Sequence, residues 1–356
     1  MPPITAIPTE KSSRRSDVSI EIKIKKLQLK NIWTISRNSS NFKDNVFIKI
    51  GRNGITGLGE AAPNVRYGEN AQLTIGKIRQ FEKTLENSDW LQFDEIKNAM
   101  DNEIKDQSCA KAAIDMAIMD WVGKSQGVPL YKLWEVNPLL TPITSYSIGI
   151  DTPEIIRKKI EQADCFPVLK IKVGRDNAVE IIKVVRGITD KPLRIDANEA
   201  WTSKQDALEK ILWMQSQNIE FIEQPMPAEM IEETSWLRER VNIPIVADEA
   251  VKRTSDIAKL AGAYDGINIK LMKSGGLLEA IKMIDIAHSF GMKVMLGCMI
   301  ESSLAITAAA HLSPQVEWAD LDGNLLISND PFEGVKVNAG KLVLNDKPGI
   351  GISGDL

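Results

Sequence analysis

The sequence lacks the patterns that mark membrane-spanning or disulfide-bonded proteins. Among its 356 residues, no apolar run approaches the roughly 20 residues that a helix needs to cross a bilayer. The three cysteines, Cys109, Cys165 and Cys298, are scattered and do not have the spacing of a metal-binding motif. Their odd number and scatter favour reduced thiols in a cytoplasmic protein. No apolar segment follows Arg14 and Arg15, so a twin-arginine export signal is not expected.

A strong excess of charge is also missing. The 44 Lys and Arg residues stand against 48 Asp and Glu residues, and the net charge is −4. No basic run with interleaved aromatic residues occurs, so a nucleic-acid surface is not expected. The hydrophobic content of 43% and the charged content of 26% are typical of a globular protein.

The pattern along the chain divides it into parts. Residues 1–18 are rich in Pro, Ser and charge, which predicts a disordered extension. In residues 19–140 strands come first and helices follow, which indicates an α+β unit. In residues 141–332 strands alternate with helices, which is typical of parallel βαβ units and favours a barrel over an open doubly wound sheet. The tail, residues 333–356, returns to strand-like alternation, and we expect it to pack back on the α+β unit.

Within the α+β unit, residues 20–29 and 45–50 have the alternation of strands. The run between them, residues 31–44, is long and polar and predicts a mobile or binding loop. Residues 57–60 (GLGE) are also predicted to form a loop. The Ala- and Met-rich residues 109–121 predict a buried helix that packs closely on a neighbour.

The chemistry of a barrel lies where its strands end. The predicted strands of the barrel are residues 143–150, 168–173, 193–196, 219–223, 243–248, 266–270, 293–297 and 317–322. Their ends carry charged residues, which are Lys172, Asp196, Glu223, Asp248, Lys270, Asp320 and Asp322.

Acids end three consecutive strands. A single acid there is usually a helix N-cap, but Asp196, Glu223 and Asp248 would converge at the barrel mouth. Three neighbouring carboxylates repel each other unless a cation lies among them. Oxygen ligands without His or Cys favour a hard ion, so the sequence predicts a Mg²⁺ site.

Lysines flank this predicted site. Lys170 and Lys172 lie on the same face of their strand, and Lys270 ends the strand opposite. Such a site suits proton abstraction α to a carboxylate, with the metal stabilising the enediolate. A lysine base must be neutral, and nearby cations lower its pKa from about 10.4. A base on one face and an acid on the other predict racemisation or epimerisation.

The remaining charged and titratable residues fit around this centre. Asp320 and Asp322 would face the metal across the substrate and bind its cationic end. His288 and His311 lie away from the strand ends, so we interpret them as packing or surface residues.

Together these motifs resemble the enolase superfamily, in its muconate-lactonising-enzyme subgroup. The segments that carry the resemblance are Lys170-Ile171-Lys172, Asp196-Ala197-Asn198, Glu223-Gln224-Pro225, Asp248-Glu249, residues 267–273 and residues 297–302. The resemblance implies a modified (β/α)₇β barrel with an N-terminal α+β capping domain that the C-terminal tail completes. It also implies one Mg²⁺ on Asp196, Glu223 and Asp248, and an acid/base pair of Lys172 and Lys270.

Within that subgroup, Asp320-Leu321-Asp322 resembles the DxD element of the dipeptide epimerases. This implies Mg²⁺-dependent epimerisation of L-Ala-Xaa dipeptides, of the Ala-Ala or Ala-Glu type, by a homo-oligomer. Residues 31–45 and 57–60 would then be cap loops that select the C-terminal side chain, and Arg37 would meet an acidic one.

The resemblance also suggests supporting residues. Lys170 and Met299 would contact the substrate, and Asn198, Glu249 and Glu301 would orient the ligands. The alternatives are an o-succinylbenzoate synthase or N-acylamino-acid racemase on the same scaffold, and a non-catalytic binding barrel. Asp320 and Asp322 discriminate among the enzymes, because an acylated substrate has no ammonium for them to bind.

Overall fold

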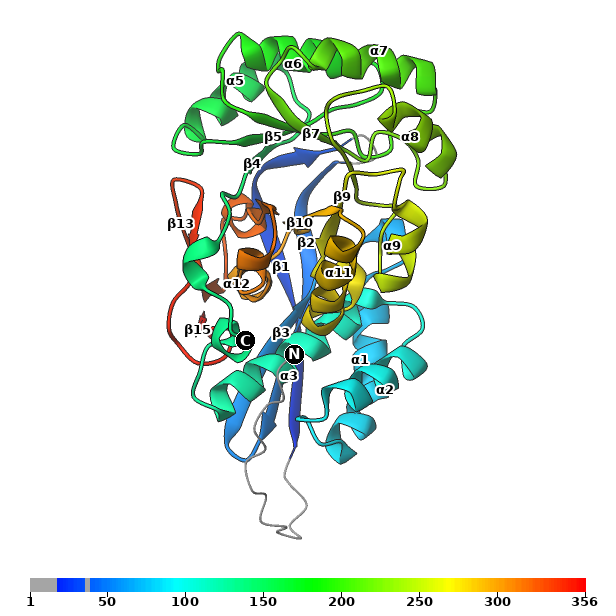
Figure 1. The fold of residues 1–356 in the computed structure, drawn as a ribbon. Coiled ribbons are helices and arrows are strands. Elements are labelled where there is room, and N and C mark those ends of the chain that lie inside the picture. The colour runs from blue at the N-terminus through cyan, green and yellow to red at the C-terminus, as the bar shows by residue number, and fades with distance from the viewer. Residues whose placement is uncertain (1–17, 36–38) are drawn as a thin grey trace.

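The computed structural model describes residues 18–35 and 39–356. The predicted N-terminal extension lies almost wholly outside the described residues, and so does Arg37. Figure 1 shows a sheet and helices from the first part of the chain beneath a barrel from the second part. Within the described residues, none of the helices combines the length and apolarity that a bilayer crossing requires.

The first sheet has three antiparallel strands in the order β1 (Ser19–Thr34), β2 (Ser39–Arg52) and β3 (Ile55–Ala61). The prediction of a loop over residues 31–44 is therefore wrong, because β1 and β2 continue through most of it and pair as far as Thr34 and Ser39. Much of this ribbon is exposed or half-buried, so its strands carry polar residues that imitate a loop.

The prediction of a loop over residues 57–60 is also wrong, since these residues lie inside β3. Helix α3 (Ser108–Ser125) packs directly on this strand. A Cβ atom on Gly57 would lie 1.9 Å from the carbonyl oxygen of Ala117, and one on Gly59 equally close to that of Ala113. The glycines thus allow close approach of helix and strand and do not mark a turn.

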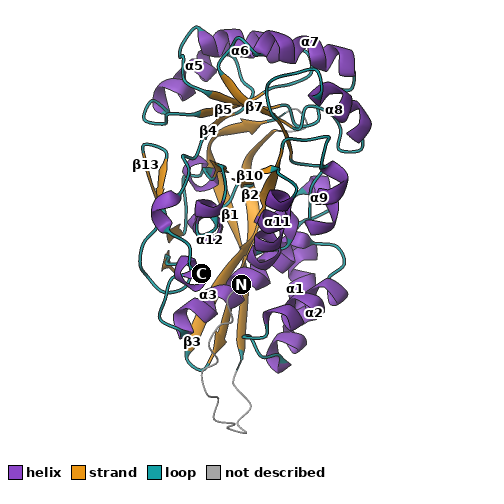
Figure 2. Ribbon diagram, viewed as in Figure 1, coloured by secondary structure: helices purple, strands orange, loops and turns teal. Residues whose placement is uncertain are grey.

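The Ala- and Met-rich segment forms α3, which is buried along most of its length, as predicted. Its neighbours in this unit are α1 (Ala71–Asn87), α2 (Phe93–Glu103) and the short α4 (Leu130–Leu133). Figure 2 shows α1, α2 and α3 at the lower end of the molecule, with β1 and β2 running up from there toward the barrel strands.

The second part of the chain forms the predicted barrel. Its parallel strands are β4 (Tyr146–Ile148), β5 (Leu169–Lys172), β6 (Leu193–Asp196), β7 (Ile219–Glu223), β8 (Ile245–Ala247), β9 (Gly266–Lys270), β10 (Lys293–Gly297) and β11 (Trp318–Asp320), in sequential order. A bridge between Thr144 and Ala319 joins the two outer strands and nearly closes the barrel. All eight strands lie within the predicted segments.

The helices of the barrel lie outside its strands (Figure 2). They are α5 (Pro153–Gln162), α6 (Ala178–Arg186), α7 (Lys204–Met214), α8 (Ile231–Arg238), α9 (Thr254–Leu260), α10 (Leu271–Ser274), α11 (Leu277–Ser289) and α12 (Ser303–Ala310). Short 3₁₀ turns are η1 (Val65–Tyr67), η2 (Pro138–Leu140), η3 (Ser313–Gln315) and η4 (Gly323–Leu326).

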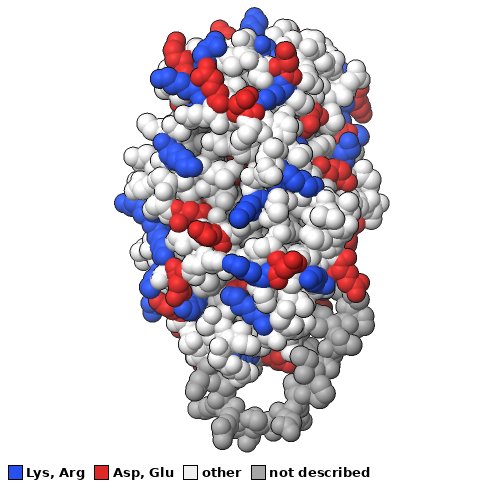
Figure 3. All heavy atoms as spheres, turned by 90° about the vertical axis from the view of Figure 1, so that its left-hand side faces the viewer, with Lys and Arg blue, Asp and Glu red and all other residues white. Residues whose placement is uncertain are grey.

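The tail returns to the α+β unit, as the sequence predicts. It forms the short strands β12 (Phe332–Glu333), β13 (Lys336–Asn338), β14 (Lys341–Val343) and β15 (Ser353–Gly354). The amide of Leu130 donates to the carbonyl of Gly349, and Lys49 pairs with Asp355 at 2.9 Å. On the face drawn in Figure 3, side chains of opposite charge are interspersed.

His311 is buried between the tail and α4. Its Nδ1 accepts a hydrogen bond from the Tyr131 amide at 3.2 Å, and Nε2 lies 2.9 Å from the Ile350 carbonyl. This pairing requires the neutral ring with a proton on Nε2. Burial lowers the pKa of His311 from 6.5 to about 4, while the contact with Ile350 opposes that shift.

We therefore expect His311 to destabilise the fold in acid. Between pH 6.5 and about 4 the unfolded chain binds a proton at this ring and the folded chain does not, so stability falls as the pH falls through this window. The contribution reaches about 3 kcal/mol at most. Urea unfolding between pH 4.5 and 7.5 should show a weaker pH dependence in His311→Gln than in wild type. His288→Gln, at a half-exposed histidine, is the control. The same change of unfolding free energy with pH in all three proteins would contradict the expectation.

Candidate active site

A cavity of about 380 Å³ opens at the carboxyl ends of the barrel strands, under the β1–β2 ribbon and the segment after β3. From the barrel it is lined by charged residues, which include Lys170, Lys172, Asp248, Lys270, Asp320 and Asp322. From the first part of the chain, Lys43, Asn45 and Arg66 reach it. Five of the seven strand-end residues predicted from the sequence therefore line one cavity. The other two, Asp196 and Glu223, are buried beside it and contact Lys172 and Lys170.

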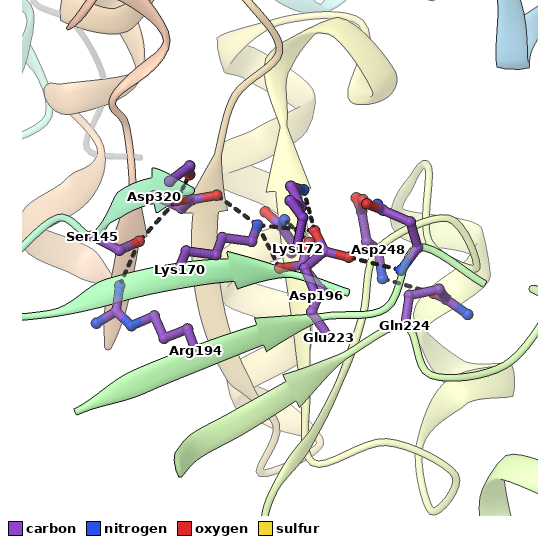
Figure 4. Close-up of polar contacts among 12 residues, drawn as sticks. Ser145, Lys170, Lys172, Arg194, Asp196, Glu223, Gln224, Asp248 and Asp320 are labelled. Atoms are coloured by element: carbon purple, nitrogen blue, oxygen red, sulfur yellow. Dashed lines mark hydrogen bonds and ion pairs between the residues drawn. The ribbon is translucent and has the colours of Figure 1, made fainter. Parts of the chain in front are cut away.

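Lys170 lies at the centre of the charge network (Figure 4). Its Nζ is 2.6 Å from Glu223 Oε2, 2.6 Å from Asp320 Oδ2 and 3.2 Å from Asp196 Oδ2. Burial alone would lower the pKa of Lys170, but the charges of Asp320, Glu223 and Asp196 raise it well above its usual value. Lys170 thus joins the predicted metal-binding acids to the predicted ammonium-binding acids.

The two predicted catalytic lysines approach from opposite sides of the barrel. Lys172 ends β5 and Lys270 ends β9, and three strands separate β5 from β9 in the sheet of eight. Lys172 Nζ lies 2.5 Å from Asp196 Oδ2, and Lys270 Nζ lies 2.9 Å from Asp248 Oδ2. Burial tends to lower the pKa of Lys270, but Asp248 and Glu223 outweigh it and raise that pKa.

The three predicted metal-binding carboxylates are buried. Burial pushes the pKa of Asp196 upward, but the ammoniums of Lys172 and Lys170 outweigh it and hold that pKa below its usual value. Burial and the charge of Asp196 raise the pKa of Glu223 to about 7. Asp248 binds two ammoniums, because Lys273 Nζ also lies 2.5 Å from its Oδ1, and its pKa is held well below its usual value against the effect of burial.

These acids fit a divalent cation by their chemistry. Glu223 Oε2 forms an ion pair with Lys170 but accepts no hydrogen bond. Within the described ranges, no three His, Cys, Asp or Glu side chains are gathered at coordinating distance, and lysine ammoniums contact each of the three carboxylates. Buried carboxylate oxygens that attract this much positive charge are the donors that Mg²⁺ prefers.

Asp320 and Asp322 lie at the other side of the cavity. Ser145 Oγ donates to Asp320 Oδ1 at 2.8 Å, and the amide of Ser147 donates to Asp322 Oδ2 at 2.6 Å. Burial and the neighbouring charge of Asp320 raise the pKa of Asp322 to about 7. Because Lys170 already contacts Asp320, Asp322 is the acid of this pair with the greater need for a further cation.

The other predicted site residues lie close to this centre. The side-chain Nδ2 of Asn198 donates to Glu249 Oε1 at 3.4 Å, and the backbone N–H of Asn198 donates to Asp196 Oδ1. Glu301 Oε1 accepts from the amide of Met299, and Met299 lines the cavity. Burial, with a contribution from Glu60, raises the pKa of Glu301 to about 8.

The sequence does not identify Glu60 as a site residue, because the loop predicted over residues 57–60 conceals the strand that carries it. It is fully buried and accepts hydrogen bonds from the amide and hydroxyl of Ser302 and from Asn45 Nδ2. Asn45 also donates to the carbonyl of Ile300. Glu60 and Asn45 therefore tie the first sheet to the loop that carries Met299. The available signal was the alternation of Gly57 and Gly59 before Glu60. Glycines at every second position indicate a strand on which another element packs closely.

Comparison with known proteins agrees with this arrangement. Residues 19–134 match the model of the mandelate racemase / muconate lactonizing enzyme N-terminal domain, and residues 156–355 match the enolase C-terminal domain-like model. The chain belongs to the mandelate racemase/muconate lactonizing enzyme family. Its barrel and its N-terminal unit are thus the two domains of an enolase-superfamily enzyme.

Within this family the chain groups with the dipeptide epimerases. It is 45% identical over 328 residues to the L-Ala-D/L-Glu epimerase of Bacteroides thetaiotaomicron, covering 92% of this chain and 85% of that protein. A dipeptide epimerase from Enterococcus faecalis V583, solved with Mg and L-Leu-L-Tyr, superposes with a TM-score of 0.89 at 33% identity, over 94% of this chain and 98% of that one.

A second solved relative is the substrate-liganded L-Ala-D/L-Glu epimerase from Bacillus subtilis. It superposes with a TM-score of 0.90 at 28% identity, over 94% of this chain and 98% of that one. These relatives thus include enzymes named for L-Ala-D/L-Glu and one solved with L-Leu-L-Tyr. Which of these side chains the enzyme accepts depends on the lining of its own cavity.

Proposed function

We propose that this family member epimerises L-Ala-Xaa dipeptides at the α-carbon of the C-terminal residue. The observation that carries the proposal is the placement of Lys172 and Lys270 on opposite strands of one cavity that also contains Asp322. Two amines on opposite faces of a carbon can exchange its proton across that carbon. The relatives named as dipeptide epimerases support the same reaction class.

The proposed reaction is a 1,1-proton transfer. The neutral amine of one lysine takes the α-proton, the Cα–H bond breaks, and its electron pair moves into the carboxylate to give a planar enediolate. The ammonium of the other lysine then donates a proton to the opposite face of the same carbon. Lys172 and Lys270 exchange these two roles according to which epimer binds.

We assign a Mg²⁺ ion to Asp196, Glu223 and Asp248. When bound, this ion supplies positive charge that stabilises the developing charge on the substrate carboxylate and favours neutral lysines nearby. Magnesium in the solved relatives supports the assignment. Around the ion, Lys170 and Lys273 would hold the outer oxygens of the carboxylates in place.

The far end of the substrate would lie on Asp322, with Asp320 beside it. The free ammonium of a dipeptide is a suitable cation for this buried pair, because burial and the charge of Asp320 raise the pKa of Asp322 to about 7. Asn198, Glu249 and Glu301 would orient their neighbours, and Met299 would contact the substrate. The cytoplasmic location and the homo-oligomer stay predictions from the sequence.

Solvent-deuterium exchange followed by NMR tests the proposal. In D₂O with Mg²⁺, L-Ala-L-Xaa dipeptides should take up deuterium at the C-terminal α-carbon, and N-acetylated forms should react at least about 100-fold more slowly because they lack the ammonium. Asp322→Asn should narrow that difference between free and acetylated dipeptides. Asp206→Asn, at a half-exposed acid of α7, is the control. Exchange confined to N-acylated amino acids would instead indicate an N-acylamino-acid racemase.

A further inference from the structure

Lys43 is a cation of the cavity for which the proposed mechanism has no use. It lies on β2 two residues before Asn45, so both side chains leave the same face of the strand. Lys43 and Asn45 line the same cavity as Lys172 and Lys270. Asn45 is buried and holds the loop after β10, whereas Lys43 is half-buried on the cavity wall formed by the first sheet.

The other cations of the cavity have carboxylate partners. Lys170, Lys172 and Lys270 contact the strand-end acids, and Arg66 pairs with Glu199 at 2.9 Å. For Lys43, no hydrogen bond or ion pair is formed within residues 18–35 and 39–356. Burial lowers the pKa of this amine, as expected for an ammonium that loses water without gaining an anion.

The geometry of the proposed intermediate indicates what faces this wall. In a planar enediolate between Lys172 and Lys270, the carboxylate, the nitrogen and the side chain lie in the plane between the two lysines. The carboxylate points to the acids of β6, β7 and β8, and the nitrogen points toward β11 with Asp320 and Asp322. The barrel interior below is filled by Lys170 and Arg194, which are both buried. The side chain is therefore directed out of the barrel, toward the first sheet.

We infer that Lys43 binds a carboxylate on the side chain of the dipeptide's C-terminal residue, and that the enzyme prefers acidic dipeptides. This inference rests on the proposed function, because it takes the position of the side chain from the proposed intermediate. An acidic side chain would neutralise the Lys43 ammonium, which has no anionic partner among the described residues of the cavity. An apolar side chain would leave that ammonium desolvated and unpaired, which is unfavourable.

Lys43→Met tests the inference through a ratio of substrates. L-Ala-L-Glu and L-Ala-L-Gln have nearly the same shape and differ in charge, so the ratio of their kcat/KM values isolates the contribution of the ammonium. In wild type the ratio should favour L-Ala-L-Glu, and in Lys43→Met it should fall by about 100-fold. Lys43→Arg should restore most of the ratio, and Lys43→Glu should favour L-Ala-L-Lys over L-Ala-L-Glu.

Lys49→Met is the matched control, because Lys49 lies on the same strand and pairs with Asp355 away from the cavity. It should keep the wild-type ratio. If wild type turns over both dipeptides and Lys43→Met has the same ratio of kcat/KM values as wild type, the inference is overturned and the proposed function stands. The inference is also overturned if Arg37→Met abolishes the preference for L-Ala-L-Glu and Lys43→Met does not. Failure of wild type to exchange any dipeptide would instead overturn the proposed function.

Discussion

Replacement of Lys172 or Lys270 by Met is expected to abolish most epimerisation, with a fall in kcat of about 10²- to 10⁴-fold. Each variant lacks the group that takes or gives the proton on one face of the α-carbon. The remaining lysine still faces the other side, so each variant should exchange deuterium into only one of the two epimers, and the two variants should select opposite epimers.

Both variants should keep the fold, for a reason visible in the ion pairs. Without Lys172, Asp196 keeps Lys170 at 3.2 Å, and without Lys270, Asp248 keeps Lys273 at 2.5 Å. Neither carboxylate is left buried without a cation, which would be the strongly destabilising outcome. Thermal unfolding should therefore show a folded protein, and Lys282→Met, at an exposed lysine of α11, should behave as wild type. Equal exchange of both epimers by either variant would contradict the two-base mechanism.

Removal of divalent metal is expected to lower activity by at least about 10³-fold, with recovery on addition of Mg²⁺. Binding should also be visible without turnover. An ion that binds only the folded state stabilises it, by about 2.7 kcal/mol at 100 times its Kd. Mg²⁺ should thus raise the unfolding temperature of wild type.

The variants Asp196→Asn and Glu223→Gln should lose most of that stabilisation by Mg²⁺. They replace a charged ligand by a neutral one of the same shape, so the comparison reports the charge. Asp206→Asn, on the outer helix α7, should keep the full shift. Full activity after exhaustive chelation, or an unchanged shift in Asp196→Asn, would disprove the assignment of these acids to a metal.

Much of the barrel could be read from the sequence because its signals are local. The barrel strands are short, and β5, β6, β7, β9 and β11 each end in a charged residue. Parallel βαβ order places successive strand ends beside one another. The acids of β6, β7 and β8 and the lysines of β5 and β9 were therefore brought to one place by topology alone. The first sheet was harder to predict, since β1 and β2 form a half-exposed ribbon whose polar residues resemble a loop.

The distribution of charge inside the site could not be read in the same way. The sequence placed Lys170 beside Lys172 as a further cation near the substrate. Only the folded chain shows that Lys170 lies among Glu223, Asp320 and Asp196, whose charges outweigh burial and raise its pKa. Glu60 and Lys43 reach the site from strands distant in sequence. Their roles depend on which side chains become desolvated together, and that is a property of long-range packing.

By itself, the sequence determined the fold class and the identity of the strand-end residues, because strand period and barrel order are encoded over short stretches. Only the tertiary structure decided which ammonium meets which carboxylate, that Glu60 anchors the loop after β10, and that Lys43 faces the cavity without an ionic partner in the described chain. Electrostatic pairing and burial depend on distances between segments far apart in the chain, and the packing of the first sheet on the barrel sets those distances.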